Sequence, residues 1–406
     1  MKIVLVNSYY YPIILGGAEY SVKKLAEVLV KNHHEVIVIC ADNKNSIEFI
    51  NGVKIYRMKV HNLISVNKNK KHNKVIMKMH RLLDFCNIFN YKMFKNVLVS
   101  EKPDLIHTNG LYEITPIVWI VARKLRIPIV HTLRDYYLLC RHVNMRHIQD
   151  NSECKAPSWG CKIYRLINKF LCGKVNAVTA PSKVTINCFL KAGFFRNIEH
   201  AVIENATEFD MEKLVALKKQ RLNKSRTDEI TFVFLGTLSE NKGILWLLDT
   251  FNKITDKRFK LKIAGKGPLE KYVVEFCKKH ENVEFLGFLG AEELNTLLYN
   301  SDVLICPSMW EEPFGRVILD AYCALMPVIV SDMGALPSLV VEGVTGSVVK
   351  HGDVEELEKA IRIYSSDNSS LFCYDSIIKQ LEKYSIDYQV KAFTDLYKNI
   401  ITGDKS

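Results

Sequence analysis

The chain has 406 residues, of which 48% are hydrophobic and 25% charged, so it is neither disordered nor fibrous and predicts about two globular domains. No apolar stretch approaches the roughly 20 residues that a membrane-spanning helix needs. The net charge is +12. Because residues 1–205 contain 31 Lys and Arg against 14 Asp and Glu, the first half is expected to face something anionic.

The opening segment MKIVLVNSYYYP predicts a core strand, since its apolar run is short and lacks the cleavage site of a signal peptide. Eleven cysteines without such a signal indicate a reducing compartment. We therefore expect a cytoplasmic location.

Apolar, β-rich runs then alternate with helical patterns along the whole chain. The expected strands are KIVLV, EVIVICA, VKIYRM, DLIH, PIVHTL and NAVTAPS, followed by TFVFLG, FKLKIAG, VEFLG, DVLICP and PVIVS. Strands separated by helices require parallel sheets covered on both faces. This α/β pattern predicts two doubly wound, Rossmann-like domains facing each other across a cleft, with ligands beyond the carboxyl ends of the strands.

The domain boundaries follow from the same alternation. Residues 1–205 and 229–384 form the two expected domains, and the polar, lysine-rich residues 206–228 are interpreted as a linker. Residues 385–406 are predicted to be an amphipathic helix that returns to the first domain. Its apolar face consists of Val390, Phe393, Leu396 and Tyr397.

Several glycine-containing loops follow strands and precede helices. They are Gly16-Gly17, the loop from Gly236 to Lys242-Gly243, and the loop with Gly265 and Gly267. Glycine lets the backbone approach a ligand closely, and a helix N-terminus attracts phosphate. Lys242 is suited to neutralise a diphosphate. Each feature alone also fits an ordinary turn or a solvated lysine.

The most specific segment spans residues 307–346. Glu311 and Glu312 follow a strand there, a helix starts near Phe314-Gly315, and Asp320 lies on that helix eight residues after Glu312. Acidic residues near a helix start also complement the helix dipole, so this pattern alone leaves both interpretations open.

Taken together and in this order, the motifs resemble the retaining GT-B glycosyltransferases of glycosyltransferase family 4, many of which build bacterial capsule, O-antigen or other surface polysaccharides. The resemblance covers essentially the whole chain. Its strongest element is an acidic E-x7-E pattern, matched by Glu312 and Asp320. The family's glycine-rich first loop matches Gly16-Gly17, and its phosphate loop matches the segment from Gly236 to Lys242-Gly243.

The resemblance implies a role for each matched residue. Glu312 would contact sugar hydroxyls of a nucleotide-sugar donor, Asp320 the ribose hydroxyls and Lys242 the diphosphate. Gly287 would line the base pocket, and the Phe314-Gly315 backbone would face the sugar phosphate. The implied reaction retains the anomeric configuration, and fixed cations stabilise the leaving diphosphate. The other donor-binding candidates are Gly16, Gly17, Gly236, Thr237, Gly265 and Gly267.

The sequence departs from the family pattern at several positions. Asp320 replaces a glutamate, Thr237 stands where the phosphate loop has an arginine, and Ser338 stands where a glutamate is common. In HTLRDYYLLC, Arg134 occupies the place before the aspartate where a histidine is frequent. We hypothesise that Arg134 supplies, across the cleft, the charge that Thr237 lacks, and we group it with Glu312 and Lys242 as catalytic.

Two alternatives for this segment stay open. Arg134 would be structural if it paired with Asp135 or another acid. His131 would be the sugar-contacting histidine if the alignment shifted by three residues.

Metal binding is not expected. Four clustered cysteines could hold zinc, but their spacing lacks a C-x2-C knuckle, which favours free thiols. They are Cys140, Cys154, Cys161 and Cys172. The sequence has no D-x-D pair to chelate a metal–nucleotide donor. We therefore expect no metal and no other cofactor.

A strongly basic stretch lies between residues 54 and 95. It contains 11 Lys and Arg, one acid (Asp84) and interleaved apolar residues. This pattern fits a helix that binds anionic lipid, and nearly as well a core-facing helix with a solvated basic face. The charge of the first half favours lipid, so we expect peripheral binding to the inner face of the cytoplasmic membrane.

The predicted function is sugar transfer from a nucleotide-sugar, with UDP, GDP and ADP all open, to a saccharide acceptor carried on a lipid such as a polyprenyl diphosphate. The first domain would bind the acceptor and the second the donor. The alternatives are a sugar-nucleotide epimerase of the same fold and a non-catalytic partner subunit. No nucleic-acid partner is expected, because the basic half lacks an aromatic stacking platform.

Overall fold

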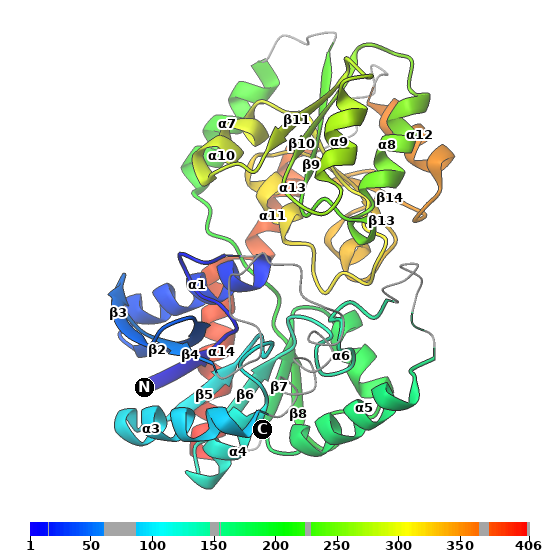
Figure 1. Ribbon diagram of the computed structural model, residues 1–406. Helices are drawn as coiled ribbons and strands as arrows, with labels where there is room; N and C mark the ends of the chain where they lie inside the picture. The colour runs from blue at the N-terminus through cyan, green and yellow to red at the C-terminus, as the bar shows by residue number, and fades with distance from the viewer. Residues whose placement is uncertain are drawn as a thin grey trace. The chain divides into compact units, whose positions relative to one another are not determined.

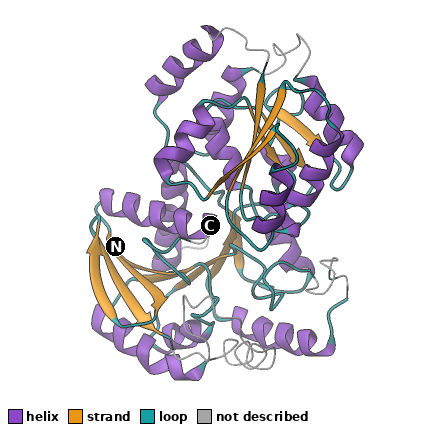
Figure 2. Cartoon of the chain, turned by 45° about the horizontal axis from the view of Figure 1, so that its top comes forward, coloured by secondary structure: helices purple, strands orange, loops and turns teal. Residues whose placement is uncertain are grey.

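The computed structural model describes residues 1–14, 16–60, 87–146, 154, 156–223, 229–364 and 373–403. These residues form two compact α/β units, coloured along the chain in Figure 1. Unit 1 runs to Asn205 and also includes the chain from Ile386 onward. Unit 2 runs from Ala206 to Ser385. Each unit has a Rossmann-like parallel sheet with helices on both faces (Figure 2).

The sheet of unit 1 is parallel except at one edge, where β3 pairs antiparallel with β4. In spatial order its strands are β3 (Ser46–Ile50), β4 (Val53–Lys59), β2 (Glu35–Asp42), β1 (Lys2–Val6), β5 (Leu105–Thr108), β6 (Ile129–Thr132), β7 (Ala177–Ala180) and β8 (Glu199–Val202). Its central strands are continuous apolar runs because both faces are covered. Ile3 to Val6, for example, are fully buried.

The helices of unit 1 include one from the far end of the chain. They are α1 (Gly17–Lys31), η1 (Ile88–Asn90), α3 (Tyr91–Glu101), α4 (Ile117–Lys124), α5 (Trp159–Cys172), α6 (Lys183–Lys191) and α14 (Ile386–Thr402). The predicted apolar face of α14 is buried. The hydroxyl oxygen of Tyr397 lies 2.6 Å from Nδ1 of His107, and the ring centres of Phe393 and His107 are 5.0 Å apart. The terminal helix is therefore part of the unit 1 core.

The sheet of unit 2 is entirely parallel. In spatial order its strands are β11 (Val283–Gly287), β10 (Phe259–Ala264), β9 (Ile230–Leu235), β12 (Val303–Cys306), β13 (Val328–Ser331) and β14 (Gly346–Val349). Its helices are α7 (Met211–Asn223), η2 (Glu240–Lys242), α8 (Ile244–Lys253), α9 (Glu270–Cys277), α10 (Ala291–Tyr299), α11 (Arg316–Cys323), η3 (Leu336–Leu339), α12 (Val354–Ile363) and α13 (Tyr374–Lys383).

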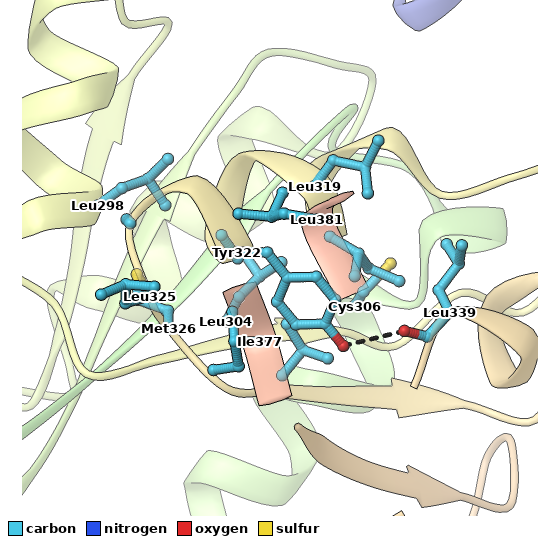
Figure 3. Close-up of a cluster of buried hydrophobic side chains, with 14 of the residues drawn as sticks. Leu298, Leu304, Cys306, Leu319, Tyr322, Leu325, Met326, Leu339, Ile377 and Leu381 are labelled. Carbon is cyan, nitrogen blue, oxygen red and sulfur yellow. Dashed lines mark hydrogen bonds between the residues drawn. The ribbon is translucent and has the colours of Figure 1, made fainter. Parts of the chain in front are cut away.

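One core cluster of unit 2 fixes helix α11, which lies within the most specific sequence segment, residues 307–346. Tyr322 on α11 is fully buried, and its phenol donates to the carbonyl oxygen of Leu339 at 3.0 Å (Figure 3). Leu304 of β12 and Leu381 of α13 belong to the same cluster. These contacts hold α11 in a fixed position relative to β12.

The expectation of a linker at residues 206–228 is corrected by the structure, because the described part of this segment belongs to unit 2. The described part of this segment contains α7, and Leu214 is buried in the unit 2 core. Arg221 donates to the carbonyl oxygens of Ala324 (2.8 Å) and Ser301 (3.1 Å). Leu214, Leu217 and Arg221 thus anchor a helix whose overall polarity suggested a linker.

Candidate active site

The order of the strands places the site of unit 2. From β9 the chain runs to β10 and β11 on one side, and β12 to β14 lie on the other, so the order reverses between β9 and β12. Ligands of such sheets bind where the strand order reverses, beyond the carboxyl ends of the strands. The loop after β9 contains Lys242, and the loop after β12 contains Glu312.

Lys242 and Glu312 form a close ion pair at this position. The ammonium of Lys242 donates to Oε1 of Glu312, and it also lies 5.0 Å from the ring centre of Trp310. The hydroxyl of Ser308 donates to the same Oε1 at 2.6 Å. Among the described residues, Oε2 of Glu312 has no hydrogen-bond partner. The glutamate is 6% exposed, so a fixed, largely desolvated carboxylate keeps one oxygen for a ligand.

Two glycines make this pairing possible. Gly243 has φ +74°, and a Cβ there would lie 1.7 Å from the carbonyl oxygen of Pro307. Gly334 has φ +61°, and its Cβ would lie 2.3 Å from the backbone nitrogen of Glu312. Both positions combine a left-handed backbone with contacts that exclude a side chain. The loops after β9, β12 and β13 can therefore meet around Glu312.

The other predicted glycines of unit 2 also lie at the carboxyl edge of its sheet. A Cβ on Gly265 would lie 1.9 Å from the carbonyl oxygen of Gly236, and one on Gly267 would lie 2.5 Å from that of Leu238. Gly287 ends β11 with φ +71° and faces open space. Thr237 lies between Gly236 and Leu238 in the loop after β9. The structure thus brings the predicted glycine loops against one another.

The second acidic residue is held separately from Glu312. Asp320 on α11 pairs with Arg316 at 2.9 Å, one turn earlier, and its side chain is 23% exposed. Burial raises the pKa of Asp320, and Arg316 opposes that shift. Gly315 caps this helix with φ +99°. The Phe314 ring is buried against Tyr384, so at this position the backbone is the part left to face a ligand.

In unit 1 the strand order reverses between β1 and β5. The residues that follow these strands are joined there, since the amide of Gly110 donates to Oδ1 of Asn7 at 2.8 Å. Gly16 caps helix α1, which Gly17 begins, and the Gly16 amide donates to Oε2 of Glu19 at 2.8 Å. The glycine pair is therefore a helix start whose first free amide is met by the chain's own carboxylate.

Arg134 lies after β6 and is 9% exposed. Its Nε donates to Oδ1 of Asn109 at 3.0 Å, and its Nη1 donates to Oδ1 of Asn205. Within the described residues, Nη2 is buried without a hydrogen-bond partner. Burial lowers the pKa of Arg134 to about 10. The expected alternative, a pair with Asp135, is not what the structure shows: the partners are two neutral amides.

His131, the alternative to Arg134, is buried in the core of unit 1. It is 3% exposed, its Nδ1 lies 2.9 Å from the hydroxyl of Thr108, and Trp119 packs edge-on against its ring. Burial lowers its pKa to about 3. By contrast, burial raises the pKa of Asp135 to about 6, and its Oδ1 accepts the amide of Tyr137 at 2.8 Å.

Two further expectations concern metal and membrane. Among the described residues, no group of three or more His, Cys, Asp or Glu side chains is arranged to hold a metal, and this includes the four clustered cysteines. Of the basic stretch 54–95, residues 61–86 lie outside the described part. Among the described helices, none has the length and apolarity that crossing a bilayer requires.

Comparison with known proteins finds a glycosyltransferase family model for each half of the chain. Residues 217–399 match the family model described as glycosyl transferases group 1, and residues 15–209 match the model described as glycosyltransferase family 4. An uncharacterized 42.6 kDa protein in the cps region of Klebsiella pneumoniae is 28% identical over 98% of this chain and 100% of its own. An uncharacterized glycosyltransferase of Methanocaldococcus jannaschii is 27% identical over 98% of both chains.

Solved structures agree on the fold. Sucrose-phosphate synthase from Thermosynechococcus elongatus superposes with a TM-score of 0.75 at 20% identity, covering 99% of this chain and 100% of that one. HepE from Anabaena, in complex with UDP-glucose, has a TM-score of 0.67 at 18% identity, over 98% and 100% of the two chains. The chain is therefore a glycosyltransferase with the GT-B fold, built from a family 4-like and a group 1 domain.

Sequence reasoning missed several side chains that complete these sites. Ser308 and Trp310 lie in the segment already singled out, so their place beside Glu312 was a readable signal. Asn109 follows β5 and was equally readable as a polar residue at a strand end. Asn205 lies 71 residues from Arg134 with no motif of its own, and only the tertiary structure joins the two.

Proposed function

We propose that the chain transfers a sugar from a nucleotide-sugar to a saccharide acceptor with retention of the anomeric configuration, as a member of glycosyltransferase family 4. The observation that carries this proposal is the Lys242–Glu312 pair at the reversal point of unit 2. The similarity to a protein from a cps region supports a role in capsule or related surface-polysaccharide synthesis. The UDP-glucose held by HepE supports a nucleotide-sugar as the donor class.

The proposed roles follow from the chemistry of each group. The ammonium of Lys242 stabilises negative charge on the leaving diphosphate, and such fixed charges act most strongly where water is excluded. Oε2 of Glu312 accepts hydroxyls of the donor sugar, while Lys242 and Ser308 hold Oε1 in place. The acceptor hydroxyl attacks from the face that the diphosphate leaves. Asp320 is assigned to the ribose hydroxyls, and Gly287 to the base pocket.

We assign Arg134 to a phosphate-bearing group of the substrates. Its unpaired Nη2 and its neutral amide partners leave the guanidinium charge without a carboxylate among its hydrogen-bond partners. A buried, uncompensated cation is costly for the folded protein, and binding an anion would offset that cost. Gly16 and Gly17 are assigned to contact with the donor.

We further propose a reaction without a metal and an acceptor carried on a lipid. With Lys242 supplying the positive charge and no D-x-D pair in the sequence, transfer is proposed to need no divalent metal. The acceptor is proposed to be carried on a lipid such as a polyprenyl diphosphate, and the protein to bind peripherally to the inner face of the cytoplasmic membrane. Chelation with EDTA should therefore leave the rate unchanged.

A transfer assay tests the function. The purified protein is incubated with UDP-, GDP- and ADP-sugars and polyprenyl-diphosphate-linked saccharides, and the anomeric configuration of the product is determined by NMR. We expect one donor class to give a product with the donor's own anomeric configuration. A product of inverted configuration would contradict retention. Interconversion of the donor sugar without any acceptor would instead identify an epimerase.

A further inference from the structure

Helix α5 of unit 1 carries a stripe of exposed apolar side chains. Trp159 is 79% exposed, Leu166 68% and Phe170 70%, with Ile163 at 38% between them. Their spacing of four, three and four residues places all four on one face of the helix. Scattered exposed apolar residues are ordinary, but an aligned row on one helix marks an interaction surface.

The opposite face of α5 is firmly attached to unit 1, so the stripe cannot turn inward. Asn168 donates to the carbonyl oxygen of Leu138 at 3.0 Å, and Arg165 donates to that of Leu139 at 2.9 Å. The hydroxyl of Tyr164 donates to the carbonyl oxygen of Tyr137. The Ser158 hydroxyl caps the helix start by accepting the amide of Cys161. The rotation of the helix is thus fixed with its apolar row toward solvent.

The charge around the stripe is of one sign. Residues 156–198 contain seven Lys and Arg and no Asp or Glu. Lys162 and Lys169 are exposed and lie along one border of the stripe. Lys174 follows the helix, with its ammonium 5.1 Å from the ring centre of Phe170. Figure 1 shows α5 at the periphery of unit 1, beside α6.

We propose that α5 docks the chain on an anionic lipid surface, with the apolar row inserted at the level of the headgroups and the lysines bound to lipid phosphates. This inference rests on the membrane location proposed above and names the surface responsible for it. Tryptophan and phenylalanine beside lysines, on a helix lying in the plane of the interface, are the composition that such binding uses. Each lysine near an anionic surface adds about 1 kcal/mol, or roughly fivefold in affinity.

Vesicle sedimentation tests the proposal with the full-length protein. Vesicles of phosphatidylcholine with phosphatidylglycerol are compared with vesicles of phosphatidylcholine alone. We expect wild type to bind the anionic vesicles in a salt-sensitive way. The triple variant Trp159→Ser/Leu166→Ser/Phe170→Ser should bind at least about tenfold more weakly, because its buried apolar area is lost. Lys162→Glu/Lys169→Glu should lose comparable affinity without touching the apolar row.

The control variant Ile47→Ser/Phe49→Ser/Leu222→Ser removes a comparable exposed apolar surface elsewhere and should bind like wild type. If wild type binds but both α5 variants bind equally well, the inference fails while the membrane location stands. If wild type ignores anionic vesicles, both fail. If instead the α5 variants abolish self-association in sedimentation velocity and leave vesicle binding intact, the stripe is a contact between copies of this chain, which also overturns the proposal.

Discussion

At the residue scale, Arg134 is buried without a carboxylate among its hydrogen-bond partners. Its guanidinium is buried, it bonds two asparagine side chains, and burial lowers its pKa to about 10. Since the folded pKa lies below the unfolded value of 12.5, the charged form at neutral pH is penalised by folding. Residues that destabilise a fold in this way are typical of functional sites.

Arg134→Met therefore separates function from stability. We expect transfer to fall at least about tenfold, because an anion loses its charged partner. The free energy of unfolding should stay level or rise, since the desolvated charge is gone. Urea unfolding and a kinetic assay on the same preparation measure both effects. Unchanged kcat/KM would contradict the assignment of Arg134 to a phosphate-bearing group of the substrates. A large loss of stability would show that Arg134 has a structural role.

His131 gives a prediction about pH. Its folded pKa of about 3 lies below the ordinary value of 6.5, so the unfolded chain binds a proton that the folded chain does not. The neutral ring stabilises the fold above pH 6.5, and that contribution is lost as the pH falls toward 3. Between pH 7 and pH 5 the loss from this residue is about 2 kcal/mol.

Urea unfolding of wild type and His131→Gln at several pH values measures this contribution. The variant is expected to have lower stability at pH 7, because the packed ring is lost, but a flatter decline toward pH 5. His107 is buried beside Tyr397, and burial lowers its pKa as well, so it contributes a parallel slope in both proteins. Identical slopes in the two proteins would show that His131 is not held neutral by the core.

At the scale of elements, helix α14 packs the C-terminal end of the chain into the core of unit 1. Phe393 is fully buried and packs 5.0 Å from the ring of His107 on β5. Phe393→Ala should destabilise unit 1 by about 3–5 kcal/mol, through lost burial and the cavity left behind. The matched variant Tyr388→Ala, on the exposed side of the same helix, should cost less than about 1 kcal/mol. Equal effects would show that α14 is not part of this core.

The elements also show what the sequence could and could not reveal. Strands buried on both faces were readable as continuous apolar runs, and every expected run became a strand. The sequence reading missed β3, β8 and β14, although Asn51-Gly52, both with positive φ, is a hairpin signal between β3 and β4. The expected linker was wrong, because Leu214, Leu217 and Arg221 attach α7 to unit 2, and two leucines in a lysine-rich helix are a weak apolar pattern.

For the site, the sequence indicated which loops meet but not how their side chains pair. Lys242 and Glu312 were both named from their motifs, whereas their direct contact and the role of Ser308 come from the structure. Asp320 was named from the same family pattern, and the structure shows that it pairs with Arg316, four residues earlier on the same helix. The Arg316–Asp320 pair is local and follows from helical spacing, whereas the Lys242–Glu312 pair joins two loops that lie 70 residues apart in the sequence.

At the scale of the whole molecule, the chain contains two Rossmann-like units, and we propose that the nucleotide-sugar donor binds unit 2. Unit 2 holds the Lys242–Glu312 pair, and unit 1 holds the buried cation of Arg134. A donor that binds unit 2 in the folded state stabilises the protein by mass action, by about 2.7 kcal/mol at a hundred times Kd. This link between binding and stability gives a direct test that needs no acceptor.

The most direct measurement is thermal unfolding of the purified protein with a panel of UDP-, GDP- and ADP-sugars, alongside Glu312→Gln, Lys242→Ala and the control Lys257→Ala. We predict that one nucleotide class raises the melting temperature of wild type and of Lys257→Ala by several degrees. Lys242→Ala should lose most of this shift, and Glu312→Gln the part that depends on the sugar. Stabilisation of equal size in all four proteins, or by no nucleotide-sugar at all, would contradict the assignment of the donor site.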